Sequence, residues 1–275
     1  MIPTRRRAHL FHGEKIWYAR DWQAPLEKAG IARGKDWSRL CPGDFVSGGS
    51  PITNCFRVEL ANAEVGYFKR YVYARPRPQF WMLPSKAAIE VFGYNVMRQH
   101  DMEVPRVVAY GEQRRYGNLL AAFIVTKEIP ATINLVQFAR DQWSVMPEPA
   151  RTETYKQIAE RLCTQVSRMH AAGFFHHDLK WKNILLRHDA DGWHPIWIDC
   201  PRAARVRLRK RRSVIIDLGR LGRLAAHYLS IKQRLRWLHA YLGPQAGKKD
   251  VKKLFYEVKS YLDRRPVAHD YELPK

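Results

Sequence analysis

The chain has 275 residues, 46% hydrophobic and 12% aromatic, so it is long enough for one large domain or for two lobes around a cleft. This composition excludes wholesale disorder. The 48 Lys and Arg against 26 Asp and Glu give a formal net charge of +22, which implies an anionic partner such as nucleic acid, anionic lipid or a phosphorylated substrate. The longest apolar run, Leu119–Val125, is too short to span a bilayer, and we expect an intracellular protein that is not integral to a membrane.

Residues between about 42 and 73 carry the signals of strands, whereas the first forty residues show only weak periodicity. Turn signals lie at 42–44 and 48–51, and short apolar alternations come between and after them, such as the one at residues 56–60. Residues 65–73 predict a further strand, with Lys69 on one face and its neighbour on the other.

A helix is predicted next, with Ser85 as its N-cap and Pro105 beyond its end. Its apolar face follows from i, i+3, i+7 spacing and comprises Ile89, Phe92 and Val96. Residues 106–110 and 119–126 then read as two strands around a turn.

After Pro130 the pattern becomes mainly helical. Apolar residues spaced along 158–169 predict a long helix that Gly173 stops, and 248–265 predict a basic amphipathic helix. The order of elements predicts an α+β fold with a small β-rich lobe, residues 1–128 with an N-terminal extension, and a larger helical lobe, residues 129–275. We expect the two lobes to form a single domain.

The segment with the clearest chemistry is residues 176–183, His-His-Asp-Leu-Lys-Trp-Lys-Asn. It resembles the catalytic loop of the protein-kinase-like superfamily, with His177 where arginine is usual. In such a loop a carboxylate, here Asp178, orients the proton of the attacking hydroxyl. Asn183, five residues later, reaches a metal ion on the ATP phosphates, and Lys180 offsets the charge of the transferring phosphoryl group.

The residues that follow fit the same interpretation. A strand at 184–186, a turn at Asp191-Gly192 and a returning strand at 195–198 predict a hairpin that ends at Asp199. In the superfamily this position holds the second magnesium ligand and is followed by Phe-Gly. Here Cys-Pro-Arg follows instead, which weakens the case for a protein-kinase-type activation switch without removing the ligand.

Upstream, Lys69 fits the strand lysine that holds the α- and β-phosphates of ATP, and Glu90 on the next helix is its expected ion-pair partner. Arg70 competes with Lys69 for this role but should point to the opposite face of the strand. The loop over the nucleotide is the poorest match, because residues 46–50 lack the pattern G-x-G-x-x-G.

Residues 45–230 as a whole resemble the lipopolysaccharide core kinases, the Kdo and heptose kinases of Gram-negative bacteria. The resemblance is carried by Gly66–Arg70, the helix around Glu90, Phe123–Ile129, Thr132–Leu135, His176–Asn183, Ile198–Ala203 and Asp217-Leu218. It implies a protein-kinase-like two-lobed fold, ATP with Mg²⁺, and phosphorylation of a heptose or Kdo hydroxyl of the inner core. It also implies that Glu128 contributes to nucleotide binding and that Asp217 is a helix-start carboxylate bracing the catalytic loop. Lys127 departs from the family pattern, in which an acidic residue is more usual.

The resemblance gives the positive charge a use. The arginine-rich stretch 202–212 follows Asp199, where arginines can engage the carboxylates and phosphates of a lipopolysaccharide core oligosaccharide. Nucleic acid is the weaker partner, because the stretch lacks aromatic residues for base stacking. We expect a cytoplasmic protein, and the basic helix at 248–265 leaves open a peripheral position on the anionic cytoplasmic face of the inner membrane. Its apolar side packing on the helical lobe is the alternative.

Two other functions remain open at this point. One is a kinase for a protein or a small molecule. The other is a catalytically silent kinase-like binding protein, which the weak glycine loop supports. The presence of Lys69, Asp178, Asn183 and Asp199 favours an active enzyme, because each has a distinct role in ATP turnover.

Overall fold

The computed structural model describes residues 10–50, 52–60, 63–76 and 78–265, so the predicted turn residue Pro51 lies outside the described part. The described chain divides into two compact units. The first contains the residues up to Asn95 together with Pro105–Pro130, and the second contains Val96–Val104 together with the residues from Ala131 onward. The change of unit after Pro130 lies close to the predicted boundary at 128/129, but the second unit also takes the short segment 96–104. That the two form one domain stays a prediction.

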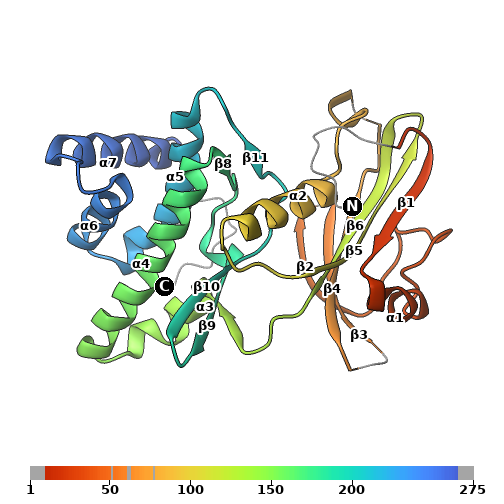
Figure 1. The fold of residues 1–275 in the computed structure, drawn as a ribbon, viewed down its shortest axis with the longest axis horizontal. Helices are drawn as coiled ribbons and strands as arrows, with labels where there is room; N and C mark the ends of the chain where they lie inside the picture. Colours follow the sequence, from red (N-terminus) through yellow and green to blue (C-terminus); the bar gives the residue numbers. More distant parts are fainter. Residues whose placement is uncertain (1–9, 51, 61–62, 77, 266–275) are drawn as a thin grey trace. The chain divides into compact units, whose positions relative to one another are not determined.

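The first unit is built on a six-stranded antiparallel sheet with the strand order β1-β5-β6-β4-β3-β2 (Figure 1). Its strands are β1 (Gly13–Tyr18), β2 (Asp44–Ser50), β3 (Thr53–Glu59), β4 (Val65–Val72), β5 (Val107–Arg115) and β6 (Asn118–Lys127). Its helices are α1 (Gln23–Lys28), the first part of α2 (Lys86–Gln99), and 3₁₀ turns at Arg20–Trp22 and Pro78–Phe80. The sequence patterns missed β1, which pairs with β5 at one edge of the sheet.

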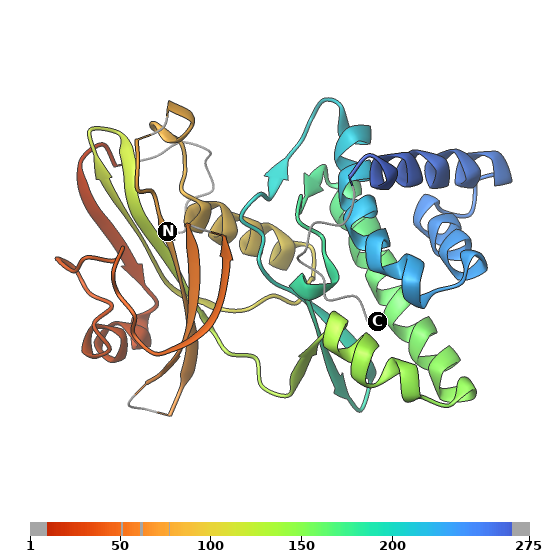
Figure 2. The same ribbon diagram turned by 180° about the vertical axis from the view of Figure 1, so that it is seen from behind.

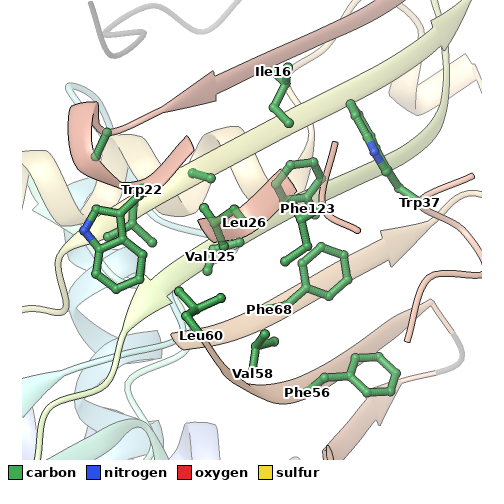
Figure 3. Packing of buried hydrophobic residues seen from close by; sticks show 14 of the residues in the cluster. Ile16, Trp22, Leu26, Trp37, Phe56, Val58, Leu60, Phe68, Phe123 and Val125 are labelled. Atoms are coloured by element: carbon green, nitrogen blue, oxygen red, sulfur yellow. The ribbon is translucent and has the colours of Figure 1, made fainter. Parts of the chain in front are cut away.

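The core of this unit lies between one face of the sheet and the N-terminal segment (Figure 3). Alternate positions of the central strands supply the sheet side: Val58 of β3, Phe68 of β4 and Phe123 of β6 are all buried. From the N-terminal segment come Trp22, Leu26, Ile31 and Trp37, which share the same cluster. The Trp37 ring meets Phe123 edge-on, at 4.8 Å between ring centroids.

Helix α2 begins as predicted, because the Ser85 hydroxyl accepts a hydrogen bond from the Ala88 N–H at 3.1 Å. The predicted apolar face is only partly right. Val96 is buried, but Ile89 and Phe92 are half-buried, and the other buried positions are Ala87, Glu90, Val91, Gly93, Tyr94 and Met97. The buried stripe contains a carboxylate, so hydrophobic spacing alone could not locate it.

The second unit is mainly helical, with two small sheets of strand order β10-β9-β7 and β11-β8 (Figures 1 and 2). Its helices are α3 (Leu135–Asp141), α4 (Glu148–Ala171), α5 (Lys210–Tyr228), α6 (Ile231–Leu242) and α7 (Lys248–Asp263), with the end of α2 and 3₁₀ turns at Trp143–Val145 and Trp181–Asn183. Its strands are β7 (Thr132–Asn134), β8 (Phe174–Phe175), β9 (Ile184–Asp189), β10 (Gly192–Trp197) and β11 (Ala204–Arg205). The predicted α+β class is confirmed.

Two predicted elements of this unit position the loop discussed below. The long helix is α4, and its buried side chains include the four expected apolar positions, Ile158, Leu162, Val166 and Met169. Gly173 adopts a φ of 69° just beyond it, a conformation that glycine accepts without strain. The predicted hairpin is β9–β10, in which Gly192 pairs with Asp189 and Trp197 with Ile184.

Helix α7 packs its apolar side on α5, as the second of the two alternatives expected. Val251, Leu254 and Val258 are buried, and Tyr261 lies against Gly219 of α5. Lysines including Lys248, Lys249, Lys252, Lys253 and Lys259 are exposed on the other side. In the described residues there is no helix with the length and apolarity needed to span a bilayer.

The contact between α5 and α7 predicts how two glycine substitutions in α5 change the free energy of unfolding. A methyl group on Gly219 would overlap the Tyr261 ring, 2.7 Å from Cε1, whereas one on Gly222 would meet only Val258 Cγ1 at 3.9 Å. We expect Gly219→Ala to lower the free energy of unfolding by about 1–3 kcal/mol through overpacking. Gly222→Ala should raise it by about 0.5–1 kcal/mol, because alanine favours the helix. Urea denaturation of both variants checks this, and equal effects at the two positions would contradict the packing.

Candidate active site

Two apolar side chains in the middle of the loop 176–183, Leu179 and Trp181, fix the loop to the second unit. It follows β8 and ends in the 3₁₀ turn Trp181–Asn183. Leu179 and Trp181 are buried, and the Trp181 indole donates to the Leu221 carbonyl of α5 at 2.8 Å. Asp178 and Lys180, which flank Leu179, keep 16% and 21% of their side chains exposed, so these polar groups remain accessible beside the buried anchors.

The Asp178 carboxylate is surrounded by cationic and amide donors. Its Oδ1 lies 2.5 Å from Nη1 of Arg220 and 3.5 Å from Nζ of Lys180. Its Oδ2 accepts from the Asn183 amide at 3.3 Å, and its main-chain carbonyl accepts from the same amide at 2.8 Å. The predicted catalytic residues and Asn183 therefore lie together, and Arg220 joins them.

The predicted metal ligands Asn183 and Asp199 are also neighbours. The Asn183 side chain is buried, and its main-chain carbonyl accepts from Ile198 N–H at 3.0 Å, next to Asp199. Because the Asn183 Nδ2 is directed to Asp178, its Oδ1 is the atom that a metal would use. An amide oxygen and the Asp199 carboxylate are hard oxygen donors of the kind Mg²⁺ prefers, so the donor set fits this ion.

A second group of possible metal ligands lies outside this loop. Asp189, Asp191 and His194 bring ligand atoms within 4.8 Å of one another at the β9–β10 turn. Their groups bond to one another, since the Asp189 carboxylate accepts from the Asp191 N–H and contacts the His194 ring at 2.8 Å. The turn is exposed, and its geometry is that of a self-satisfied hairpin end.

His176 is a fully buried part of the loop. Its Nδ1 accepts from the Asp178 N–H at 3.2 Å, so Nε2 carries the proton and donates to the Ile198 carbonyl at 3.3 Å. Burial lowers the pKa of His176 below its ordinary value, despite nearby carboxylates that act in the opposite direction. The neutral ring thus ties the loop to the end of the β9–β10 hairpin.

Asp217 braces the loop, but it does not stand at a helix start as expected. Helix α5 begins at Lys210, so Asp217 lies in its interior and is fully buried. Its Oδ2 accepts from the His176 N–H at 2.9 Å and lies 3.3 Å from Nε2 of His170. The other nitrogen of His170 lies 2.9 Å from the Tyr241 hydroxyl. A helix interior, rather than a terminus, therefore supplies the carboxylate.

His177 occupies the position where the superfamily has arginine. Its φ is 56°, a left-handed conformation that a non-glycine residue adopts only when held. Its ring nitrogens lie 3.2 Å from the Arg202 carbonyl and 3.0 Å from the Ser213 hydroxyl. His177 thus links the loop both to the segment after Asp199 and to α5. Sequence reasoning missed Ser213 and Arg220, although their spacing of four and three residues from Asp217 places all three on one helix face.

In the first unit, Lys69 and Glu90 form the expected ion pair. Lys69 Nζ lies 2.7 Å from Glu90 Oε1, with side chains 17% and 2% exposed. The Tyr71 hydroxyl donates to the same carboxylate oxygen. Arg70 points to the opposite face, as predicted, and donates to the Leu40 carbonyl at 2.8 Å.

Glu128 has strand neighbours as its partners. Its Oε1 accepts from the Tyr67 hydroxyl at 2.9 Å and from Arg57 Nε at 3.2 Å. The unusual Lys127 pairs with Glu64 at 2.7 Å. The residues of the weak glycine loop lie in β2, whose pairing with β3 is irregular between Phe45 and Ser50. The nucleotide-binding role of Glu128 stays a prediction.

Two further features of the second unit bear on ligands. The arginine-rich stretch is exposed at Arg202, Arg205, Arg207, Arg209 and Arg212, and Arg211 pairs with Glu257 of α7 at 2.8 Å. Residues of helices α3 to α7 line a cavity of about 680 Å³ that is open to solvent. Its lining is mainly apolar and includes Phe138, Ile158, Leu221 and Trp237.

The lowered pKa of His176 predicts how stability depends on pH. Because the folded pKa lies below the unfolded value of about 6.5, the unfolded chain binds the proton more readily. The contribution of neutral His176 to the free energy of unfolding should therefore be complete above about pH 6.5, and the free energy of unfolding should fall as the pH drops below this value. In His176→Gln the free energy of unfolding should decrease less between pH 7 and pH 5 than in the wild type. In the exposed control His239→Gln it should decrease as much as in the wild type. Denaturation at each pH measures the slopes, and identical slopes in wild type and His176→Gln would contradict the assignment.

Comparison with known proteins gives three kinds of likeness. The lipopolysaccharide core heptose(I) kinase WaaP of Pseudomonas aeruginosa is 31% identical over 153 residues, which cover 53% of this chain and 56% of that protein. WaaP of Escherichia coli is 34% identical over 79 residues, 29% of each chain. The matched segments thus span about half the length of the first relative and less of the second.

A solved structure of WaaP in complex with acyl carrier protein shares the fold, with a TM-score of 0.66 and 21% identity. The similarity covers 91% of this chain and 97% of that one. The family model of the lipopolysaccharide kinase (Kdo/WaaP) family matches residues 82–254, which include Glu90, the loop 176–183 and Asp199. The resemblance noted from the sequence is confirmed: the chain belongs to the lipopolysaccharide kinase (Kdo/WaaP) family.

Proposed function

We propose that this chain is an ATP-dependent kinase that phosphorylates a sugar hydroxyl, of heptose or Kdo, in the inner core of lipopolysaccharide. The observation that carries the proposal is the grouping of Asp178, Lys180, Asn183 and Asp199 on one loop and hairpin end. Family membership supports the sugar acceptor, and the curated relatives are named as heptose(I) kinases, which favours heptose over Kdo.

In the proposed reaction, Asp178 accepts the proton of the acceptor hydroxyl. The hydroxyl oxygen bonds to the γ-phosphorus while the bond from that phosphorus to the β–γ bridging oxygen breaks, and ADP leaves. Lys180, 3.5 Å from Asp178 Oδ1, is close enough to offset charge on the transferring phosphoryl group. Burial of Leu179 and Trp181 on either side of Lys180 holds both polar groups in register.

Nucleotide binding is assigned to the residues that the sequence predicts for it. Lys69, held by Glu90 at 2.7 Å, would engage the α- and β-phosphates, and Glu128 would contribute to the nucleotide site. Asn183 and Asp199 would hold Mg²⁺, which when bound neutralises charge on the phosphates. The buried Glu90 carboxylate accepts from Lys69 and Tyr71, and this fixes the lysine in one orientation.

The acceptor side is assigned to exposed cations of the second unit. Arg202, Arg205 and Arg207 lie just after Asp199 and are exposed, so they can pair with the carboxylates and phosphates of the inner core. The exposed lysines of α7 add positive charge on the same unit. Both features are compatible with an enzyme at the anionic cytoplasmic face of the inner membrane, because exposed basic residues are attracted to anionic lipids.

Replacement of Asp178 tests the enzyme proposal. With lipopolysaccharide from cells that lack the gene as acceptor, we expect Asp178→Ala to lower kcat by about 10²–10⁴-fold, because a positioned general base is lost. Lys69→Ala should mainly raise KM for ATP and also lower kcat. Asp141→Ala, at an exposed aspartate of α3 that pairs with Arg140, serves as the matched control. Equal phosphate transfer by Asp178→Ala and the control would remove Asp178 from its role.

We propose acyl carrier protein as a second partner. The solved relative is described in complex with acyl carrier protein, and the cavity of about 680 Å³ in this chain falls within the ~300–1,000 Å³ of ligand pockets. Its apolar lining, with Phe138, Ile158 and Leu221, suits a fatty acyl chain. We infer that the acyl group of an acylated carrier protein enters this cavity.

The cavity makes this partner testable. Ala159 lines it, so Ala159→Leu should narrow it and weaken binding of acylated carrier protein. Ala171→Leu, on the exposed end of the same helix α4, should leave binding unchanged. Calorimetric titration with acylated and unacylated carrier protein measures both. Equal affinity for the two forms, or for the two variants, would contradict an acyl site here.

A further inference from the structure

Three polar side chains of α5 each contact a successive residue of the catalytic loop. Asp217 accepts from the His176 N–H at 2.9 Å, and the Ser213 hydroxyl meets the His177 ring at 3.0 Å. Arg220 Nη1 lies 2.5 Å from Asp178 Oδ1. Positions 213, 217 and 220 follow the i, i+4, i+7 spacing of one helix face, so the helix acts as a rigid template for the loop.

Of these three side chains, only Arg220 reaches the reacting carboxylate. The same Nη1 also donates to the main-chain carbonyl of His177. His177 has a φ of 56°, so the peptide that precedes Asp178 sits in a conformation that needs support. Arg220 therefore fixes both the side chain of Asp178 and the turn that presents it.

Lys180 cannot perform this task equally well. It lies 3.5 Å from Asp178 Oδ1, against 2.5 Å for Arg220, so the arginine makes the closer charge-assisted contact. A planar guanidinium also has a fixed geometry of donors, whereas an ammonium on a flexible stem does not. The Arg220 side chain is only 16% exposed, which limits its freedom further. Lys180 is thereby left available for the transferring phosphoryl group.

We propose that Arg220 is a positioning residue: it holds the Asp178 carboxylate and the His177 carbonyl in the arrangement that phosphoryl transfer requires. The inference rests on the proposed kinase function and adds a residue to it. In this proposal Arg220 acts through its contacts with Asp178 and with the His177 carbonyl. The alternative is that the ion pair between Arg220 and Asp178 is purely structural, and stabilises the fold without changing the rate of the chemical step.

The test is a set of variants at position 220 with a matched control. We expect Arg220→Met to lower kcat by about 10²-fold, because misplacement of a reacting group by about 1 Å has an effect of this size. KM for ATP and for the acceptor should change little. Arg220→Lys should recover part of kcat, since one donor remains. The control Arg236→Met, an exposed arginine of α6, should keep the wild-type kcat.

Two further measurements separate positioning from folding. In the Asp178→Ala background, Arg220→Met should cause no further loss of kcat, because both changes remove the same function. Guanidinium ion at millimolar concentration should restore part of kcat to Arg220→Ala but none to Asp178→Ala. Thermal melting of each variant checks that it is folded at the assay temperature.

The proposal would be overturned if Arg220→Met had the same kcat as Arg236→Met. It would also be overturned if the losses of kcat from Arg220→Met and Asp178→Ala multiplied in the double variant. A third contrary result is a loss of kcat that only follows a loss of thermal stability and that neither Arg220→Lys nor guanidinium ion restores. If the wild-type chain transfers no phosphate to any core acceptor, the proposed kinase function itself fails, and the role of Arg220 fails with it.

Discussion

A loop that carries reacting groups between buried strands must satisfy its main-chain polar groups without the ladder of a helix or a sheet, because buried groups left unpaired are costly. In this chain the interior of α5 meets that constraint. Asp217 binds the main chain at His176, and Arg220 binds the carbonyl of His177. The neutral ring of His176 ties the loop to the strand end at Ile198, next to Asp199. The arrangement of Asp178, Asn183 and Asp199 depends on these contacts.

The same constraint explains the parts of the site that spacing could not reveal. The order of residues in 176–183 and the hairpin after it gave the loop, its two metal-ligand candidates and the strand that joins them. It gave the Lys69–Glu90 pair as well, because strand and helix signals around both residues were clear. Ser213 and Arg220 carry no such signal, since an exposed arginine and an inward one look alike in a basic sequence. Their roles follow from helix geometry once Asp217 is known to be buried in mid-helix.

Other differences between pattern and structure have similar causes. The apolar face expected for α2 missed the buried Glu90, because a paired carboxylate breaks the hydrophobic period on the inner side. Strand β1 was missed because its residues alternate weakly, yet it pairs with β5 and adds Ile16 to the core. For α7 the sequence left two alternatives, and the contact with Gly219 and the ion pair from Arg211 decide for packing on α5. Amphipathic spacing alone does not say what covers the apolar side.

The positive charge of the chain is prominent in two segments. Much of it is exposed on the second unit, both along α7 and in the stretch from Arg202, which follows the metal-ligand candidate Asp199 in the sequence. The most direct test of a lipopolysaccharide core kinase is mass spectrometry of the core oligosaccharide from cells with the gene, without it, and with its Asp178→Ala variant. We expect one phosphate to be lost without the gene and to be restored by the wild-type gene but not by the variant. A core of unchanged mass in all three strains would contradict it.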